Sequence, residues 1–168
     1  DIVSLTPRLR YDTRDNEFYP SDGLLLDADA AFGLEALGGL TDFELYKAAF
    51  NTYRKLGDRG VLAGRFAMEY AAGDAPFFVY PAFGSGADLR GYTTGTYRDR
   101  GLLAGQLEYR HRVTSRLGLV AFGGVGTVSP DFLGWTETLP SYGVGFRWVV
   151  AKKNDMSIRF DYAWGKDD

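Results

Sequence analysis

The sequence offers few candidates for nucleophilic catalysis that depends on histidine or cysteine. His111 is the single histidine, Ser115 follows it in a polar turn, and cysteine is absent. A catalytic triad also needs a carboxylate that orients the histidine, and none is evident near this pair. In an alternating strand, His111 shares the apolar side with Leu107 and Tyr109. We therefore predict an interfacial histidine and a protein that is not an enzyme.

Two carboxylates, Asp27 and Asp29, are spaced so that they could work as an acid–base pair or bind calcium. Residues two apart in a strand face the same side, however, so a ladder of charge explains the spacing more simply. We predict that these carboxylates form ion pairs, because arginines fall on the matching faces of other predicted strands: Arg8, Arg10, Arg65, Arg110, Arg147 and Arg159. We predict no cofactor and no metal, because the sequence has neither a cluster of cysteines and histidines at metal-ligand spacing nor a glycine loop for phosphate.

The composition indicates a folded domain rather than a disordered or disulfide-stapled chain. The 168 residues are 45% hydrophobic and 15% aromatic, with 22 glycines, and we predict a single domain over residues 1–168. The formal charge of -3 argues against nucleic acid as a partner, because binding to phosphate needs an excess of positive charge. Apolar runs such as LGLVAFGGVG are too short for a transmembrane helix. No leader peptide is evident, so an exported protein would have lost its leader before Asp1.

Period-two alternation of apolar and polar residues predicts an all-β protein with about eight strands. In the last of them Ile158, Phe160 and Tyr162 share one side, and Arg159 and Asp161 share the other. The predicted strands cover residues 2–12, 23–35, 42–54, 60–72, 101–113, 117–127, 141–151 and 156–165.

Two architectures fit this alternation: a soluble sandwich or lipocalin-like barrel with its apolar face inside, and a transmembrane β-barrel with its apolar face outside. We favour the antiparallel transmembrane β-barrel. The strands are long enough to cross a bilayer at a tilt, and the polar face mixes charges of both signs with glycine and alanine. Bulky aromatic residues also gather near strand ends, as in membrane-interface girdles: Tyr11, Tyr53, Tyr70, Tyr109, Trp148 and Trp164.

The connections alternate between short and long, which orients the predicted barrel. Outer-membrane barrels have short periplasmic turns and longer external loops. By this count both ends of the chain would lie outside the cell, and we expect at least one strand to be missing at each end of a larger barrel. The connection at 13–22 is long for the periplasmic side and fits least well. The short connections are 55–60, 114–116 and 152–155, and the long ones are 36–41, 73–100 and 128–140.

Five ordered blocks carry a resemblance to a known family: DLRGYTTGTYRDRG, GQLEYRHRV, GLVAFGGVGTV, SYGVGFRW and IRFDYAWG. They resemble the carboxyl-terminal barrel of the bacterial surface antigen family, which includes the BamA and TamA type assembly factors and relatives in two-partner secretion. RYDTRDNEFYPSDG and LAGRFAMEYAAGDAPFF fit the preceding strands, so the resemblance covers nearly the whole chain. It implies a sixteen-stranded barrel of which this chain supplies the eighth to the fifteenth strand.

The resemblance also implies a role for the loop at 73–100. The loop would fold back into the lumen, with Arg90 bound to acidic residues on the following strands, and Glu108 matches one such partner. Gly124 occupies the position of the second, so Glu108 is the main expected anchor. Gly91 would allow a sharp turn, and Tyr92, together with Tyr97, would pack against the wall. The alternative is an ordinary adhesive loop outside the cell, because such loops are often rich in tyrosine, arginine, glycine and aspartate.

The predicted function is mechanical: a β-barrel of the bacterial outer membrane that helps to insert or translocate polypeptides. The alternative is a passive barrel that anchors or exports a fused passenger domain, or a narrow pore. The expected partners are outer-membrane lipid, a β-barrel client or secreted polypeptide, and a periplasmic or passenger module outside this chain.

Overall fold

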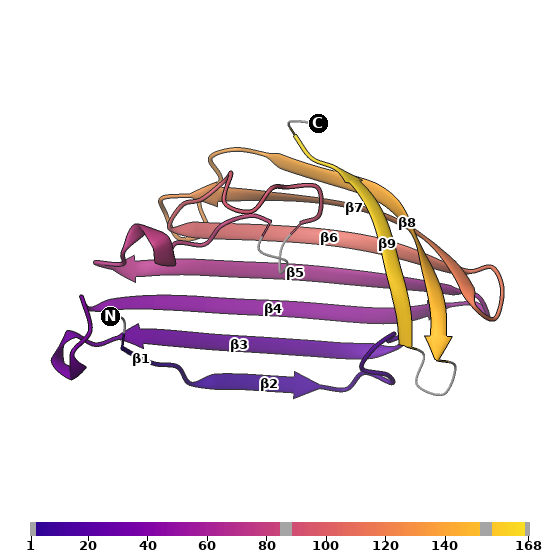
Figure 1. The fold of residues 1–168 in the computed structure, drawn as a ribbon, viewed down its shortest axis with the longest axis horizontal. Coiled ribbons are helices and arrows are strands. Elements are labelled where there is room, and N and C mark those ends of the chain that lie inside the picture. Colours follow the sequence, from indigo (N-terminus) through magenta and orange to yellow (C-terminus); the bar gives the residue numbers. More distant parts are fainter. Residues whose placement is uncertain (1–2, 85–88, 152–155, 167–168) are drawn as a thin grey trace.

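The computed structural model describes residues 3–84, 89–151 and 156–166. Its strands form one antiparallel sheet with the order β1-β3-β4-β5-β6-β7-β8-β9, and β2 also pairs with β3 (Figure 1). The strands are β1 Ser4–Leu5, β2 Arg8–Asp12, β3 Gly23–Gly33, β4 Phe43–Leu56, β5 Gly60–Gly73, β6 Gly101–Arg112, β7 Leu117–Ser129, β8 Leu139–Ala151 and β9 Met156–Trp164.

The strand prediction is confirmed with two local corrections. The first predicted strand is split into β1 and β2, because Pro7 lacks an N–H; its carbonyl still accepts a hydrogen bond from Ala30 N at 3.2 Å. Glu35, predicted to end a strand, instead begins the short 3-10 helix η1 (Glu35–Leu37), where its N–H donates to Asp42 Oδ1 at 2.8 Å. The remaining strand ends differ from the prediction by at most a few residues.

The two faces of the sheet differ sharply in chemistry, as the alternation predicts. In β6, Glu108 is 4% exposed, whereas its neighbours Leu107 and Tyr109 are 61% and 42% exposed. The concave side, here called the inner face, holds the buried charges, and the outer face exposes large apolar side chains. Such a continuous apolar surface suits contact with lipid and not with water. Outer-face residues include Leu107, Leu119, Val144, Phe146, Phe160 and Tyr162.

The sheet is strongly curved, and β8 and β9 run at a steep angle to β3 and β4 (Figure 1). Among the described residues, β9 pairs only with β8, while β1 and β2 pair only with β3. The sheet therefore forms a curved wall that is not closed into a ring. No helix within the described ranges is long and apolar enough to span a membrane.

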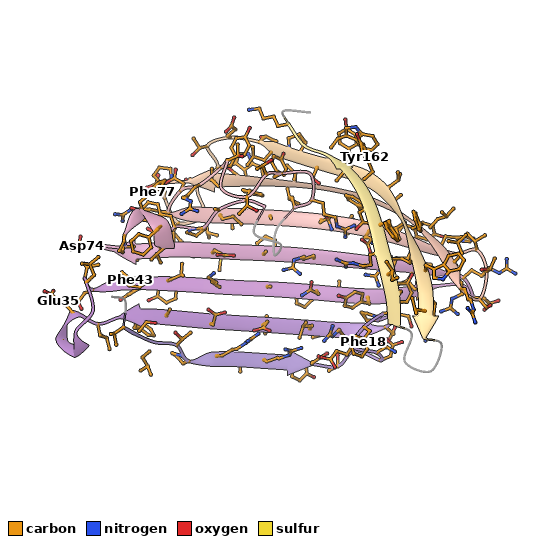
Figure 2. All side chains as sticks on the ribbon, in the orientation of Figure 1. Phe18, Glu35, Phe43, Asp74, Phe77 and Tyr162 are labelled. Atoms are coloured by element: carbon orange, nitrogen blue, oxygen red, sulfur yellow. The ribbon has the colours of Figure 1, made fainter. Side chains whose placement is uncertain are left out.

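Apart from connection 13–22, long and short connections lie at opposite ends of the strands. Figure 2 shows Glu35, Asp74 and Phe77, from long connections, at one end, and Phe18, from connection 13–22, at the other. The longest connection, residues 74–100, contains the 3-10 helix η2 (Phe77–Val79) and an isolated bridge between Ala82 and Arg98. We call it the long loop. Its residues Phe83 and Leu89 join a buried cluster with Leu102, Ala104 and other wall residues, so the loop packs on the inner face.

Candidate functional site

Arg90 and Gly91 lie where the long loop meets β8 and β9. The Oγ of Ser141 donates to the carbonyl oxygen of Arg90 at 2.6 Å, which fixes the loop backbone against β8. Gly91 has a φ of 88°, and a Cβ at this position would lie 2.8 Å from the carbonyl carbon of Trp164 and 3.0 Å from the nitrogen of Gly165. Glycine is required here for its left-handed backbone and for the close approach to the end of β9.

The guanidinium group of Arg90 contacts two carboxylates and one aromatic ring. Its Nη2 donates to Glu108 Oε2 in a very short contact, and its Nη1 donates to Asp161 Oδ2 at 3.1 Å. The guanidinium carbon lies 4.0 Å from the centre of the Phe122 ring, within the range of a cation–π interaction. Three strands, β6, β7 and β9, therefore hold one loop side chain.

Arg90 belongs to a larger network of charges on the inner face. Arg110 Nε donates to Glu108 Oε1 at 2.5 Å, and Arg147 contacts both Asp161 and Glu108. The side chains of Glu108 and Arg147 are 4% and 3% exposed. Burying charges is costly unless each is paired and hydrogen-bonded, and this arrangement gives each carboxylate at least two guanidinium partners.

The expectation that Glu108 would be the main anchor, because Gly124 stands at the second acidic position, is wrong in one respect. A second carboxylate is present, but it comes from Asp161 on β9. Gly124 has no room for an acid: a Cβ there would lie 2.6 Å from the carbonyl oxygen of Gly105 and 2.8 Å from a methyl carbon of Leu89. Leu89 of the loop thus occupies the space above Gly124, and the second charge is supplied two strands further along the sheet.

Tyr92 fastens the next part of the loop. Its hydroxyl donates to the carbonyl oxygen of Pro140 in a very short contact. Its ring lies 5.6 Å from that of Phe83 and 5.7 Å from that of Tyr97, centre to centre, in tilted and edge-on arrangements that favour aromatic packing. The predicted residues Arg90, Gly91, Tyr92 and Glu108 therefore lie together on the inner face.

Glycines of β7 and β8 make room for this packing. A Cβ at Gly126 would lie 2.7 Å from the ring of Phe83, and one at Gly143 would overlap the ring of Phe122, which itself carries Arg90. The missing side chains leave shallow depressions in the wall that large side chains fill. The glycine-rich segments therefore accommodate the loop instead of weakening the sheet.

Connection 13–22, at the other end of the strands, also reaches the network. Arg110 Nη1 donates to the carbonyl oxygen of Pro20 at 3.1 Å, and the Arg110 guanidinium lies 5.0 Å from the ring centre of Tyr19. The centre of the Tyr53 ring lies 5.5 Å from the same guanidinium. The assignment of Tyr53 to an outer aromatic girdle is therefore wrong, because this ring faces inward beside Asn51. The unusual length of the connection lets it cross to β6.

The fold of connection 13–22 depends on the ionised carboxylate of Asp15. This carboxylate accepts hydrogen bonds from the hydroxyl and N–H of Ser21 and from the N–H of Asp22. Partial burial raises the pKa of Asp15, but these hydrogen bonds and the charge of Lys55 outweigh it and lower the pKa to about 2. The folded pKa lies below the ordinary value of 3.8, so the stabilisation is present above pH 4 and is lost as the pH falls towards 2.

We expect pepsin to cut wild-type connection 13–22 much faster at pH 2 than at pH 4. Replacing Asp15 with Asn should raise cutting at pH 4, because an amide cannot accept the same charge-assisted hydrogen bonds. The ratio of wild-type to variant rates at each pH, measured by mass spectrometry of the fragments, cancels the pH dependence of pepsin itself. Asp58→Asn, in the short turn between β4 and β5, is the matched control. A wild-type to variant ratio that does not change between pH 2 and pH 4 would contradict the assignment.

The other candidate residues are not assembled for catalysis. The Tyr109 hydroxyl lies 3.3 Å from His111 Nδ1 on the outer face, and no carboxylate among the described residues is hydrogen-bonded to His111. Asp27 is held by Arg8, whose Nε donates to it at 2.8 Å, as the ion-pair interpretation predicts. Within the described ranges no group of three or more histidine, cysteine or acidic residues could hold a metal ion.

A curved antiparallel sheet with an apolar outer face, and with a loop held on its inner face by buried arginine–carboxylate contacts, is the wall of a transmembrane β-barrel. The chain matches the Omp85 superfamily domain over residues 1–168, and it belongs to this superfamily. The match agrees with the resemblance to the BamA and TamA type surface antigens. The superfamily consists typically of outer-membrane insertion and translocation factors and not of enzymes. A comparison with curated proteins gave no match.

Proposed function

We propose that this chain forms part of a bacterial outer-membrane barrel that inserts or translocates polypeptides. Superfamily membership supports the general role, and one structural observation supports the specific one. The long loop lies on the inner face and is attached through Arg90 to β6 and β9. A loop held by ion pairs inside the wall can be displaced without unfolding the strands, which is what a gated path for a polypeptide needs.

The proposed partners follow from the two faces. The outer face contacts outer-membrane lipid through its exposed apolar side chains. The inner face and the sheet edges are the surfaces offered to a β-barrel client or a secreted polypeptide, and a periplasmic or passenger module elsewhere in the protein would deliver it. Exposed edge strands can pair with an extended chain, and in lipid their unpaired backbone groups are costly.

The test uses the full-length protein in liposomes with a urea-unfolded β-barrel client. We expect the wild type to raise the fraction of client that becomes protease-protected, and we expect Arg90→Ala to change that fraction several-fold. Arg116→Ala, in the exposed turn between β6 and β7, is the control and should behave as wild type. If the wild type gives no stimulation and planar-bilayer recordings show a steady open channel, the passive barrel or narrow pore is the correct function.

A further inference from the structure

Two adjoining cavities lie beside Arg90 on the inner face, with volumes of about 600 and 110 Å³. The larger lies between the loop at Leu89–Gly91 and strand β9, and the smaller continues towards Glu108. Both are lined by the same four polar side chains: Arg65, Arg90, Gln106 and Arg159. The shared lining makes them two parts of one polar site.

Gln106 is the first sign that this site is built for a ligand. The residue is 9% exposed, and its Oε1 atom is buried without a hydrogen-bond partner among the described residues. An unsatisfied buried acceptor destabilises the fold, and such groups are rare in folded proteins. A ligand that donates a hydrogen bond to Gln106 Oε1 would remove this cost.

The charge of the lining is the second, independent sign. Among the residues that the structure describes, four arginines line the two cavities, Arg110 being the fourth, together with two carboxylates, Glu108 and Asp161. Both carboxylates are already bound by Arg90 and Arg147. The described part of the lining therefore has two more positive than negative charges, in a recess of the wall where electrostatic interactions are stronger than in bulk water.

Arg159 is the arginine best placed to bind a ligand. It lies directly opposite Arg147 in the pairing of β8 with β9, so two like charges are cross-strand neighbours. Arg147 turns to Asp161 and Glu108, whereas Arg159 forms no ion pair with any residue that the structure describes. Like charges placed opposite each other are destabilising, and an anion at Arg159 would relieve that repulsion.

We propose that this site binds a small oxyanion that carries a proton at neutral pH, of the hydrogen phosphate type. The guanidinium of Arg159 would donate to the phosphate oxygens in its forked geometry, with Arg90 at the other wall of the cavity. The Gln106 amide, whose Oε1 is buried in the free protein, would turn so that Oε1 accepts a hydrogen bond from the P–OH group. Sulfate and chloride can accept from arginine but have no proton to donate at neutral pH, so the site should discriminate against them.

The test is calorimetric titration of the full-length protein in detergent with sodium phosphate at pH 7, and with sodium sulfate at the same ionic strength. We expect saturable binding of phosphate at least about tenfold tighter than binding of sulfate, the difference being one hydrogen bond to a buried acceptor. Arg159→Gln should weaken the binding of both phosphate and sulfate. Arg116→Gln, at an exposed turn, should leave the binding of both anions unchanged.

Gln106→Leu gives a second readout that does not depend on Arg159. It removes the acceptor while keeping a similar volume, so the variant should fold and should bind phosphate and sulfate equally. Equal affinity for the two anions in the wild type, or binding that Arg159→Gln leaves unchanged, would overturn the proposal. Because the assay contains no client polypeptide, its outcome is independent of the insertion and translocation activity.

Discussion

Replacement of Glu108 by Gln is expected to lower the free energy of unfolding by about 3–5 kcal/mol, the typical cost of removing one partner from a buried ion pair. Glu108 contacts Arg90, Arg110 and Arg147, and its side chain is 4% exposed. The amide keeps the shape of the carboxylate but loses its charge. Arg110 would then have no carboxylate among its described partners, while Arg90 and Arg147 would share Asp161 alone.

The measurement is unfolding in urea, followed by the shift between folded and unfolded mobility of the detergent-solubilised protein in gels. Glu69→Gln is the control, because Glu69 makes a single ion pair among the described residues, with Lys47 at 3.2 Å, in which the lysine side chain is 42% exposed and the glutamate side chain 13%. A pair that is open to water on one side contributes less than a fully buried one, so we expect a smaller loss in this variant. Equal losses of unfolding free energy in the two variants would show that the contacts of Glu108 stabilise the fold no more than a single ion pair does.

The second large effect is expected from Gly91→Ala, which should release the long loop from the wall. Alanine is strained at a φ of 88°, by about 1–2 kcal/mol. Its Cβ would also press on the backbone of Trp164 and Gly165, which cannot move away as a flexible side chain could. We expect trypsin to cut after Arg90 at least about tenfold faster in this variant, because displacing the backbone breaks the contacts of Arg90.

Gly95→Ala separates the two causes. Gly95 lies in the same loop with a φ of 86°, but a Cβ there would meet only the Arg98 side chain, at 3.8 Å. Its substitution carries the backbone strain without the collision. If Gly95→Ala exposes Arg90 to trypsin as much as Gly91→Ala does, the close approach of the loop to β9 has no special role.

The strands and their faces could be predicted from the sequence because period-two alternation is a local property, and it is clear in nearly every strand. The Arg90–Glu108 pairing could be anticipated from the family resemblance, with support from the position of Glu108 on the polar side of its strand. Tyr53 was misplaced because its position near a strand end is typical of an aromatic girdle. Its spacing of two from Asn51 places it on the inner face.

The contacts of Asp161 and of connection 13–22 with the network could not be predicted, for a different reason. The contact between Arg90 and Asp161 depends on how far the sheet curls between β6 and β9, and curvature accumulates over several strands without a local signal. The hydrogen bond from Arg110 to Pro20 spans 90 residues of sequence. The length of connection 13–22 was the one available sign that this segment does more than reverse the chain.

The glycines of β7 and β8 have a consequence for how this sequence can change. Phe83 lies over Gly126 and Leu89 over Gly124, so loop and strand together fill one fixed thickness of protein. A Cβ in the strand would also lie 2.6 Å from the carbonyl oxygen of Gly105 at Gly124, and 2.5 Å from that of Leu103 at Gly126, so a smaller loop residue alone would not make room for it. We therefore expect substitutions of Gly124 and Gly126 to be rejected whatever residue the loop carries above them, so that the wall sets the space to which the loop must adapt.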